Sequence, residues 1–180
     1  MLYLFDLDGT LISSYMEHPT KEYAAWYMLP GRITRIAQLL EEGHSVSVVT
    51  NQGSVAFGYT ALDEVHTKFR QVSQLLHFGG MWIHHDTSTS FEGWHEEGQL
   101  LNVHIFVCYA DPRATVEKYR DGAYRRKPSP VMLHEACVVF NHAVEDTHYI
   151  GDRPEDQQAA HAAGIPFTWA EVFFSSTTDG

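Results

Sequence analysis

Residues 2–10 read Leu-Tyr-Leu-Phe-Asp-Leu-Asp-Gly-Thr, a short apolar run that ends in two carboxylates. The uninterrupted apolar residues predict a buried strand over 2–5. Asp6 and Asp8 follow at its carboxyl end, and Gly9 frees the chain to turn. Ligands of a parallel sheet collect outside the carboxyl ends of its strands, so chemistry is expected here. An ordinary strand exit explains either Asp alone, but explains less well Asp6, Asp8, Gly9 and Thr10 together.

Length and composition indicate a globular protein. We expect one domain over 1–180, because 180 residues can bury a substantial core and 44% of them are hydrophobic. The net charge of −11 argues against a broad nucleic-acid footprint, although a few cations could hold a nucleic-acid end. Cys108 and Cys137 are too far apart for a disulfide framework, which fits a cytoplasmic location. We expect no signal peptide and no membrane span.

Strand-like and helix-like patterns alternate along the chain, which predicts an α/β fold with a doubly wound, mostly parallel sheet. Besides the first strand, we expect strands at 44–50, 102–109, 147–150 and 165–169, and helices at 30–42, 61–77, 129–140 and 155–163. Residues 11–28 are expected to form a loop, or a flap with a short helix. Residues 81–101 are expected to be a surface insertion, and the chain beyond 174 to fray.

The segment 81–101 contains histidines and tryptophans that invite functional readings. His84 and His85 would be poor joint metal ligands, because adjacent residues of a strand point to opposite faces. Contact with a substrate through Trp82 or Trp94 is the more credible reading.

Polar residues also follow two later strands. Thr50 ends the second strand, where a turn is one explanation and a hydroxyl that holds a phosphate oxygen is another. Asp152 and Asp156 follow the strand at 147–150. Acids stabilise the start of a helix, which explains Asp156 better than it explains Asp152.

A basic run precedes the predicted helix at 129–140, where Ser129 would cap the helix and Pro130 would take its first position. A solvated basic patch is the simplest reading of Arg125, Arg126 and Lys127. The alternative is that Lys127 points into the site as a compact positive charge.

These segments, in this order, resemble the four motifs of the haloacid dehalogenase-like (HAD) superfamily. The matching residues are Asp6, Asp8, Gly9, Thr10, Thr50, Lys127, Gly151, Asp152 and Asp156. The strings Thr50-Asn51-Gln52 and Arg126-Lys127-Pro128 resemble one branch more narrowly. That branch includes histidinol-phosphate phosphatases, heptose bisphosphate phosphatases and the 3′-phosphatase domain of polynucleotide kinases. The chain departs from it at Gly53-Ser54, where Ser-Gly is usual, and at Phe57, where Arg is frequent.

The resemblance implies a role for each matching residue. Asp6 would be the nucleophile and Asp8 the general acid and base, while Thr50 and Lys127 would hold the phosphoryl oxygens. Asp6, Asp152 and the Asp8 backbone carbonyl would bind Mg²⁺. Gly151 and Asp156 would support that arrangement, with Asp156 acting on the metal shell or on Lys127. Asn51 and Arg126 would contact the phosphate or the substrate.

The resemblance also bears on cofactors and on a cap. Heptose phosphatases carry a zinc loop of cysteines and a histidine, but here only Cys108 stands near the expected place, so we expect no zinc. The spacing between the motifs leaves little room for a cap domain, which predicts a capless or minimally capped enzyme.

The expected activity is Mg²⁺-dependent phosphomonoester hydrolysis through an aspartyl-phosphate on Asp6. The substrate would be a small phosphorylated metabolite, such as a sugar phosphate or histidinol phosphate. Dehalogenation is disfavoured because that reaction needs no acid like Asp8. One alternative is a 3′-phosphatase for nucleic-acid ends. Another is a catalytically silent phosphate-binding or assembly subunit. The oligomeric state stays open.

Overall fold

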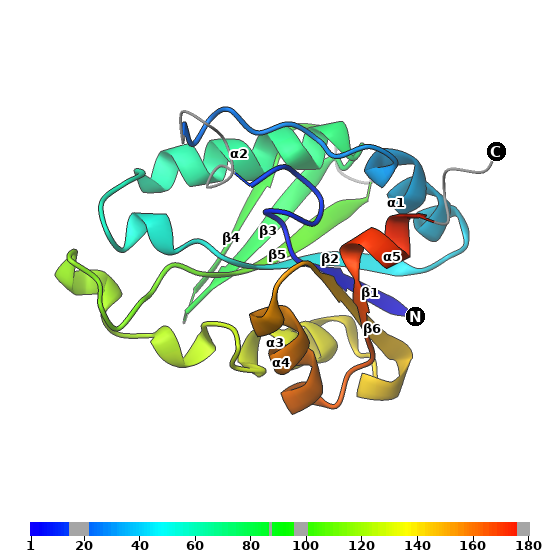
Figure 1. The fold of residues 1–180 in the computed structure, drawn as a ribbon. Coiled ribbons are helices and arrows are strands. Elements are labelled where there is room, and N and C mark those ends of the chain that lie inside the picture. Colours follow the sequence, from blue (N-terminus) through cyan, green and yellow to red (C-terminus); the bar gives the residue numbers. More distant parts are fainter. Residues whose placement is uncertain (15–21, 87, 96–100, 176–180) are drawn as a thin grey trace.

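A computed structural model describes residues 1–14, 22–86, 88–95 and 101–175. In these ranges a seven-stranded sheet has the order β4-β3-β5-β2-β1-β6-β7, and every neighbouring pair is parallel except β3 and β4 (Figure 1). This confirms the predicted α/β class. The strands are β1 (Leu2–Phe5), β2 (Ser45–Asn51), β3 (Gly80–His85), β4 (Ser88–Gly93), β5 (Asn102–Cys108), β6 (Thr147–Gly151) and β7 (Phe167–Trp169).

The helices cover both faces of the sheet, with α1, α2 and α5 on one face and α3 and α4 on the other (Figure 1). Strand β1 is therefore buried on both sides, and its side chains alternate between two cores. Phe5 packs with α1 and α2, whereas Leu2 and Leu4 pack with α3 and α4. The helices are α1 (Arg32–Glu41), α2 (Leu62–Leu75), α3 (Val131–Phe140), α4 (Pro154–Ala163) and α5 (Ala170–Ser175).

The segment that was expected to be a surface insertion belongs instead to the sheet. Residues 80–85 form β3, which pairs in parallel with β5, and residues 88–93 return as the antiparallel strand β4. Met81 and Ile83 are buried, so hydrophobic packing draws β3 into the core, while β4 stays mostly exposed. Five strands were expected, and the sheet has two more, β3 and β4.

Smaller differences concern the ends of elements. Helix α3 starts at Val131, one residue later than expected, and Pro130 is its N-cap. Helix α5 was not predicted, because six residues are too few for a clear periodic pattern. The expected fraying beyond 174 and part of the expected flap at 11–28 lie outside the described residues.

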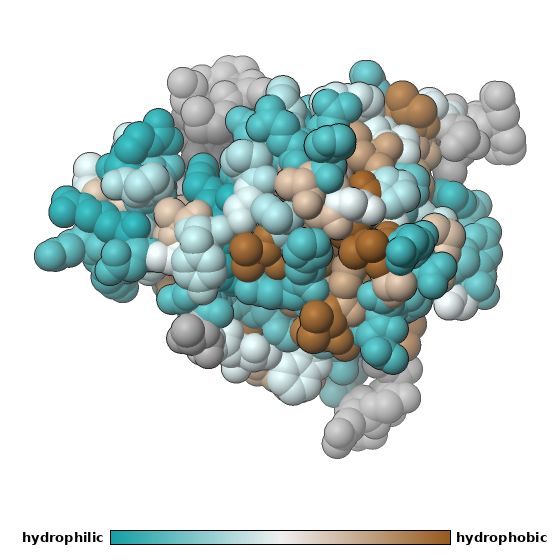
Figure 2. All heavy atoms as spheres, turned by 90° about the horizontal axis from the view of Figure 1, so that it is seen from below, coloured by the Kyte–Doolittle hydropathy of each residue, from teal (hydrophilic) through white to brown (hydrophobic). Residues whose placement is uncertain are grey.

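In the described part of the chain, the connections after β1 and β2 have defined local structure. Residues 22–28 run back along the start of the chain, with Ser13 N–H donating to Tyr27 O at 2.9 Å and Leu29 N–H to Leu11 O at 3.0 Å. A short 3₁₀ turn, Gly53–Val55, follows β2. From below, the face with α3 and α4 shows apolar residues in small patches separated by hydrophilic ones (Figure 2). No helix in the described part of the chain is long and apolar enough to cross a membrane.

Candidate active site

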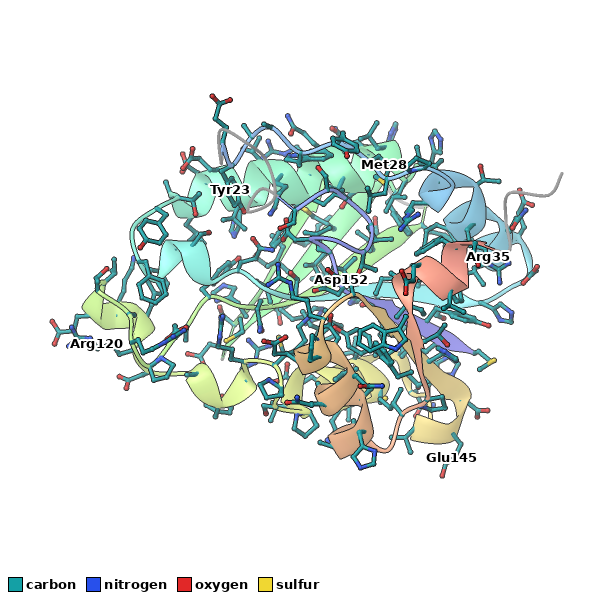
Figure 3. The ribbon with its side chains drawn as sticks, viewed as in Figure 1. Tyr23, Met28, Arg35, Arg120, Glu145 and Asp152 are labelled. Atoms are coloured by element: carbon teal, nitrogen blue, oxygen red, sulfur yellow. The ribbon has the colours of Figure 1, made fainter. Side chains whose placement is uncertain are left out.

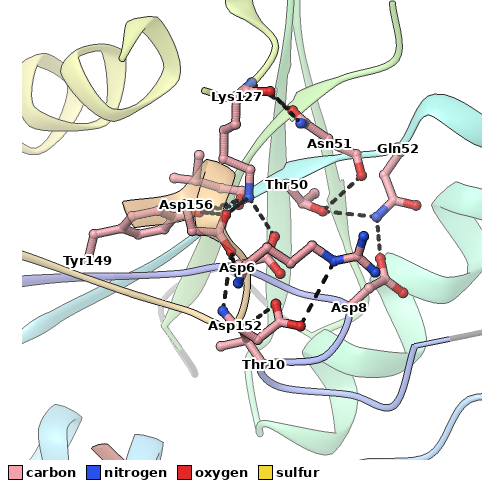
Figure 4. A network of polar contacts seen from close by, with 12 residues as sticks. Asp6, Asp8, Thr10, Thr50, Asn51, Gln52, Lys127, Tyr149, Asp152 and Asp156 are labelled. Atoms are coloured by element: carbon pink, nitrogen blue, oxygen red, sulfur yellow. Dashed lines mark hydrogen bonds and ion pairs between the residues drawn. The ribbon is translucent and has the colours of Figure 1, made fainter. Parts of the chain in front are cut away.

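Residues from four distant segments meet at the carboxyl ends of β1, β2 and β6 (Figure 4). Asp6 follows β1, Thr50 lies near the end of β2, Asp152 follows β6, and Lys127 precedes α3. These strands are adjacent and parallel, so their carboxyl ends share one edge of the sheet. The predicted convergence of these four residues is therefore present in the fold.

Lys127 is the centre of this cluster. Its buried Nζ donates to Asp6 Oδ1 at 2.6 Å, Asp156 Oδ1 at 2.6 Å, Tyr149 Oη at 2.8 Å and Val49 O at 3.1 Å. Burial lowers the pKa of Lys127, but the Asp6 and Asp156 carboxylates outweigh burial and the pKa is raised. Lys127 therefore stays charged and is not part of a solvated basic patch.

Both oxygens of Asp156 are already used by the protein. Besides Lys127, Oδ1 accepts from Tyr149 Oη at 2.9 Å, and Oδ2 accepts from the backbone N–H groups of Asp152 at 3.2 Å and Arg153 at 3.1 Å. A Cβ at Gly151 would come within 2.5 Å of Asp156 Cβ, so glycine permits this approach. Of the two expected roles for Asp156, the geometry favours orienting Lys127.

The remaining carboxylates, Asp6 and Asp152, form a donor set that suits a hard cation. Single oxygens of Asp6, Asp152 and Asp156 lie within 4.8 Å of one another. Burial raises the pKa of Asp6 well above its ordinary value, with Asp156 and Asp152 adding to the rise and Lys127 opposing it. Burial, followed by the charge of Asp156, raises the pKa of Asp152. A divalent cation would relieve this repulsion, and Mg²⁺ prefers such oxygen ligands.

The turn after β1 is shaped for close approach to Asp152. Gly9 has φ 88°, and a Cβ there would lie 2.1 Å from Asp152 Oδ2. Thr10 Oγ1 donates to Asp152 Oδ1 at 3.3 Å. The Asp-Gly-Thr sequence thus lets the turn after β1 lie directly against Asp152, which follows β6.

Asp8 has two partners that were not foreseen, Lys68 of α2 and Gln52. Lys68 Nζ lies 3.1 Å from Asp8 Oδ1 and 3.2 Å from Oδ2, and Gln52 Nε2 donates to Oδ2 at 2.7 Å. The position of Lys68 in the helix could have indicated that it has a buried partner. It falls three residues after Val65 and four before Val72, on the apolar stripe, where an unpaired cation would be costly.

Thr50 and Asn51 are both in the site, but in different ways. Thr50 Oγ1 accepts from Gln52 Nε2 at 2.9 Å. The Asn51 side chain instead holds the backbone of Lys127, because Nδ2 donates to Lys127 O and Oδ1 accepts from Lys127 N–H, each at 3.1 Å. Asn51 therefore has at most one amide hydrogen left for the expected contact with phosphate. The observed hydrogen bonds of its side chain position Lys127.

The three consecutive cations separate in the structure. Arg125 is buried and paired with Glu135 at 2.6 Å. Arg126 Nε lies 3.6 Å from Asp111 Oδ2, and among the described residues its buried Nη1 has no hydrogen-bond partner. A Cβ at residue 53 would come within 2.9 Å of Nη1, so the Gly53-Ser54 order makes room for Arg126.

The other candidates lie apart from this cluster. His84 Nε2 pairs with His104 Nδ1 at 2.8 Å, and Trp94 Nε1 donates to Phe78 O at 2.9 Å. The buried Cys108 Sγ lies 3.8 Å from both Ala110 O and Gly122 O. A hollow of about 520 Å³ beside α3 contains none of the site carboxylates, so the reaction site is assigned to the strand edge.

Comparison with known proteins identifies the family of the chain. Residues 1–174 match the model of the family described as polynucleotide kinase 3 phosphatase. The D-glycero-beta-D-manno-heptose-1,7-bisphosphate 7-phosphatase of Rhodopseudomonas palustris is 31% identical over 163 residues, which cover 89% of this chain and 78% of that protein.

Two solved structures share the fold. A structure described as a HAD-like phosphatase from Mesorhizobium loti is 25% identical with a TM-score of 0.69, and the match covers 91% of this chain and 68% of that one. The D,D-heptose 1,7-bisphosphate phosphatase of B. bronchiseptica, complexed with magnesium and phosphate, is 23% identical with a TM-score of 0.63. That match covers 99% of this chain and 87% of the other. The chain is a phosphatase of the HAD superfamily and belongs to its polynucleotide kinase 3 phosphatase family.

Proposed function

We propose that the protein is a Mg²⁺-dependent phosphomonoesterase that works through an aspartyl-phosphate on Asp6 and acts on a small phosphorylated metabolite. The observation that carries this proposal is the placement of Asp6. Its Oδ1 is held by the buried Lys127 Nζ at 2.6 Å, and Asp152 stands close by. A carboxylate nucleophile needs such positive charge, because it must approach a phosphate dianion.

Each step uses a named group of this chain. An Asp6 oxygen bonds to phosphorus while the ester bond breaks, and Asp8 gives its proton to the departing oxygen. Asp8 then takes a proton from water, whose oxygen bonds to phosphorus as the Asp6–phosphorus bond breaks, releasing phosphate. Lys127 keeps the Asp6 carboxylate oriented. Mg²⁺, held by Asp6, Asp152 and the Asp8 carbonyl, would supply charge neutralisation for the phosphoryl oxygens.

A sugar phosphate is the substrate class that we favour. The relative from Rhodopseudomonas palustris, which is named as a heptose bisphosphate phosphatase, supports this class because the similarity covers 89% of the chain. The net charge of −11 also disfavours a long anionic polymer. Arg126 is the cation that we expect to contact an anionic part of the substrate, because its Nη1 has no hydrogen-bond partner among the described residues.

The second candidate is a 3′-phosphatase for nucleic-acid ends, which the matching family model favours by its description. A panel of phosphorylated sugars, histidinol phosphate and a 3′-phosphorylated oligonucleotide distinguishes the two, with phosphate release as the readout. We expect release from a sugar phosphate and its loss in excess chelator. Release from the oligonucleotide alone would overturn the metabolite proposal.

Asp6→Asn tests the remaining alternative, a silent phosphate-binding or assembly subunit. This change keeps the size of the side chain but removes the nucleophile. We expect turnover to disappear while the far-ultraviolet circular dichroism stays the same. A wild-type protein that releases no phosphate from any member of the panel would favour the silent alternative.

A further inference from the structure

The burial of Lys68 has no explanation in packing alone. The residue lies on the apolar side of α2, and only 2% of it is exposed. Burying an ammonium group costs roughly several kcal/mol unless charged or polar partners compensate. An aliphatic residue would avoid this cost and would suit the core better. The partners of Lys68 should therefore reveal its role.

Among the described residues, the hydrogen-bond partners of Lys68 are Asp8 and Gln52, which both belong to the candidate active site. Its Nζ lies 3.1 Å from Asp8 Oδ1, 3.2 Å from Asp8 Oδ2 and 3.1 Å from Gln52 Oε1. The ring of Tyr23 covers the ammonium, with its centroid 4.3 Å away, and Tyr23 lies beside α2 in Figure 3. The ammonium group thus lies between the Asp8 carboxylate and the ring of Tyr23.

Gln52 extends this contact to the end of β2. Its Nε2 donates to Asp8 Oδ2 at 2.7 Å and to Thr50 Oγ1 at 2.9 Å, while its Oε1 accepts from Tyr23 Oη at 2.9 Å. Asp8 Oδ1 therefore accepts from Lys68, and Oδ2 accepts from both Lys68 and Gln52, which restricts rotation of the carboxylate. The network differs from that of Lys127, which among the described residues donates to Asp6 but not to Asp8.

We propose that Lys68 is a positioning residue for Asp8, which it holds with Gln52 in the orientation that delivers a proton to the departing oxygen. This rests on the proposed function, in which Asp8 is the general acid. Lys127 orients the nucleophile, and Lys68 orients the acid. Each catalytic carboxylate thus has its own buried lysine.

The test uses the dependence of the first step on the leaving group. For each protein, kcat/KM is measured with p-nitrophenyl phosphate, whose phenolate leaves without a proton, and with glycerol phosphate, whose alkoxide needs one. Because kcat/KM reports events up to formation of the phosphoenzyme, slow hydrolysis of that intermediate does not hide the effect. Lys68→Met should lose about 10- to 100-fold on glycerol phosphate and about threefold or less on p-nitrophenyl phosphate.

Two further variants serve as comparisons for the substrate dependence of Lys68→Met. Asp8→Asn should show the same selectivity with a larger loss. Val72→Ala, which truncates a buried apolar side chain on the same helix and removes no hydrogen bond to Asp8, should lower stability and leave the ratio of the two substrates unchanged. Equal losses on both substrates in Lys68→Met, or no loss at all, would refute the positioning role.

A crystal structure of Lys68→Met gives a readout that does not depend on turnover. We expect the Asp8 carboxylate to rotate away from its wild-type position, and an unchanged carboxylate would overturn the proposal. If wild-type protein released phosphate neither from these two substrates nor from any member of the metabolite and oligonucleotide panel, the proposed function would fail, while the orientation of Asp8 would still decide the role of Lys68.

Discussion

The carboxyl edge of β1, β2 and β6 and the β3–β5 part of the same sheet bury polar side chains in opposite ways. At the edge, Lys127 lies between Asp6 and Asp156, and its pKa is raised. Beside β3 and β5, His84 and His104 pair with each other. Burial, aided by the neighbouring His84, lowers the pKa of His104 to about 4.

The difference lies in the surroundings of each pair. The lysine meets two carboxylates, which offset the loss of hydration and keep it charged. The imidazoles meet aromatic rings, with Phe106 4.4 Å from His84 and Phe140 4.9 Å from His104 between centroids. Rings offer no full negative charge, so the histidines stay neutral. The lysine at the edge is thus kept charged by carboxylates, whereas the histidine pair stays neutral, and the buried Arg125 nearby has its own partner in Glu135.

The largest expected effect comes from Lys127→Met. Removing the ammonium group leaves the Asp6 and Asp156 carboxylates without a compensating positive charge. The free energy of unfolding, measured in urea, should therefore fall by about 3–5 kcal/mol. Turnover should fall below detection. Lys118→Met, at an exposed position, is the matched control and should keep wild-type stability. Wild-type stability in Lys127→Met would mean that the edge tolerates unpaired carboxylates and would remove the contrast.

Tyr149→Phe should have an intermediate effect. The Tyr149 hydroxyl bridges Lys127 Nζ at 2.8 Å and Asp156 Oδ1 at 2.9 Å, and its loss should cost about 1–2 kcal/mol in urea unfolding. Because Asp6 and Asp156 still pair with Lys127, activity should survive at a reduced level. Loss of all activity would instead give the hydroxyl a direct part in the reaction.

The smallest effect is expected at the histidine pair and depends on pH. His104 has its pKa lowered in the folded state, so the unfolded chain binds a proton more readily between its ordinary value of about 6.5 and about 4. Stability should therefore be lost as pH falls through this window. Allowing for the partial exposure of His104, the loss of unfolding free energy at pH 5 should be of the order of 1 kcal/mol.

Urea unfolding at pH 7 and pH 5 checks this expectation. His104→Gln can keep a hydrogen bond to His84 but does not titrate, so its stability should fall less between the two pH values than that of the wild type. Identical pH dependence in the two proteins would show that the pair is not a source of acid sensitivity.

The parts of the fold that could be predicted were those with a strong local pattern. The buried first strand and the amphipathic helix at 61–77 appear as β1 and α2. The hairpin of β3 and β4 was missed because only one face of β3 is fully apolar. Met81 and Ile83 are buried, whereas Trp82 is 36% exposed and reads as surface. Strand β4 is polar along most of its length, as an edge strand can be.

The sequence by itself determined which side chains stand at the carboxyl ends of the strands, because the polar residues directly follow the apolar runs. Asp6, Thr50 and Asp152 could be found in this way, and Lys127 by its place before a helix. Only the tertiary structure decided which cation serves which carboxylate. Lys127 reaches Asp6 across 121 positions and Lys68 reaches Asp8 across 60. Such pairings depend on how helices pack on the sheet, which local periodicity does not encode.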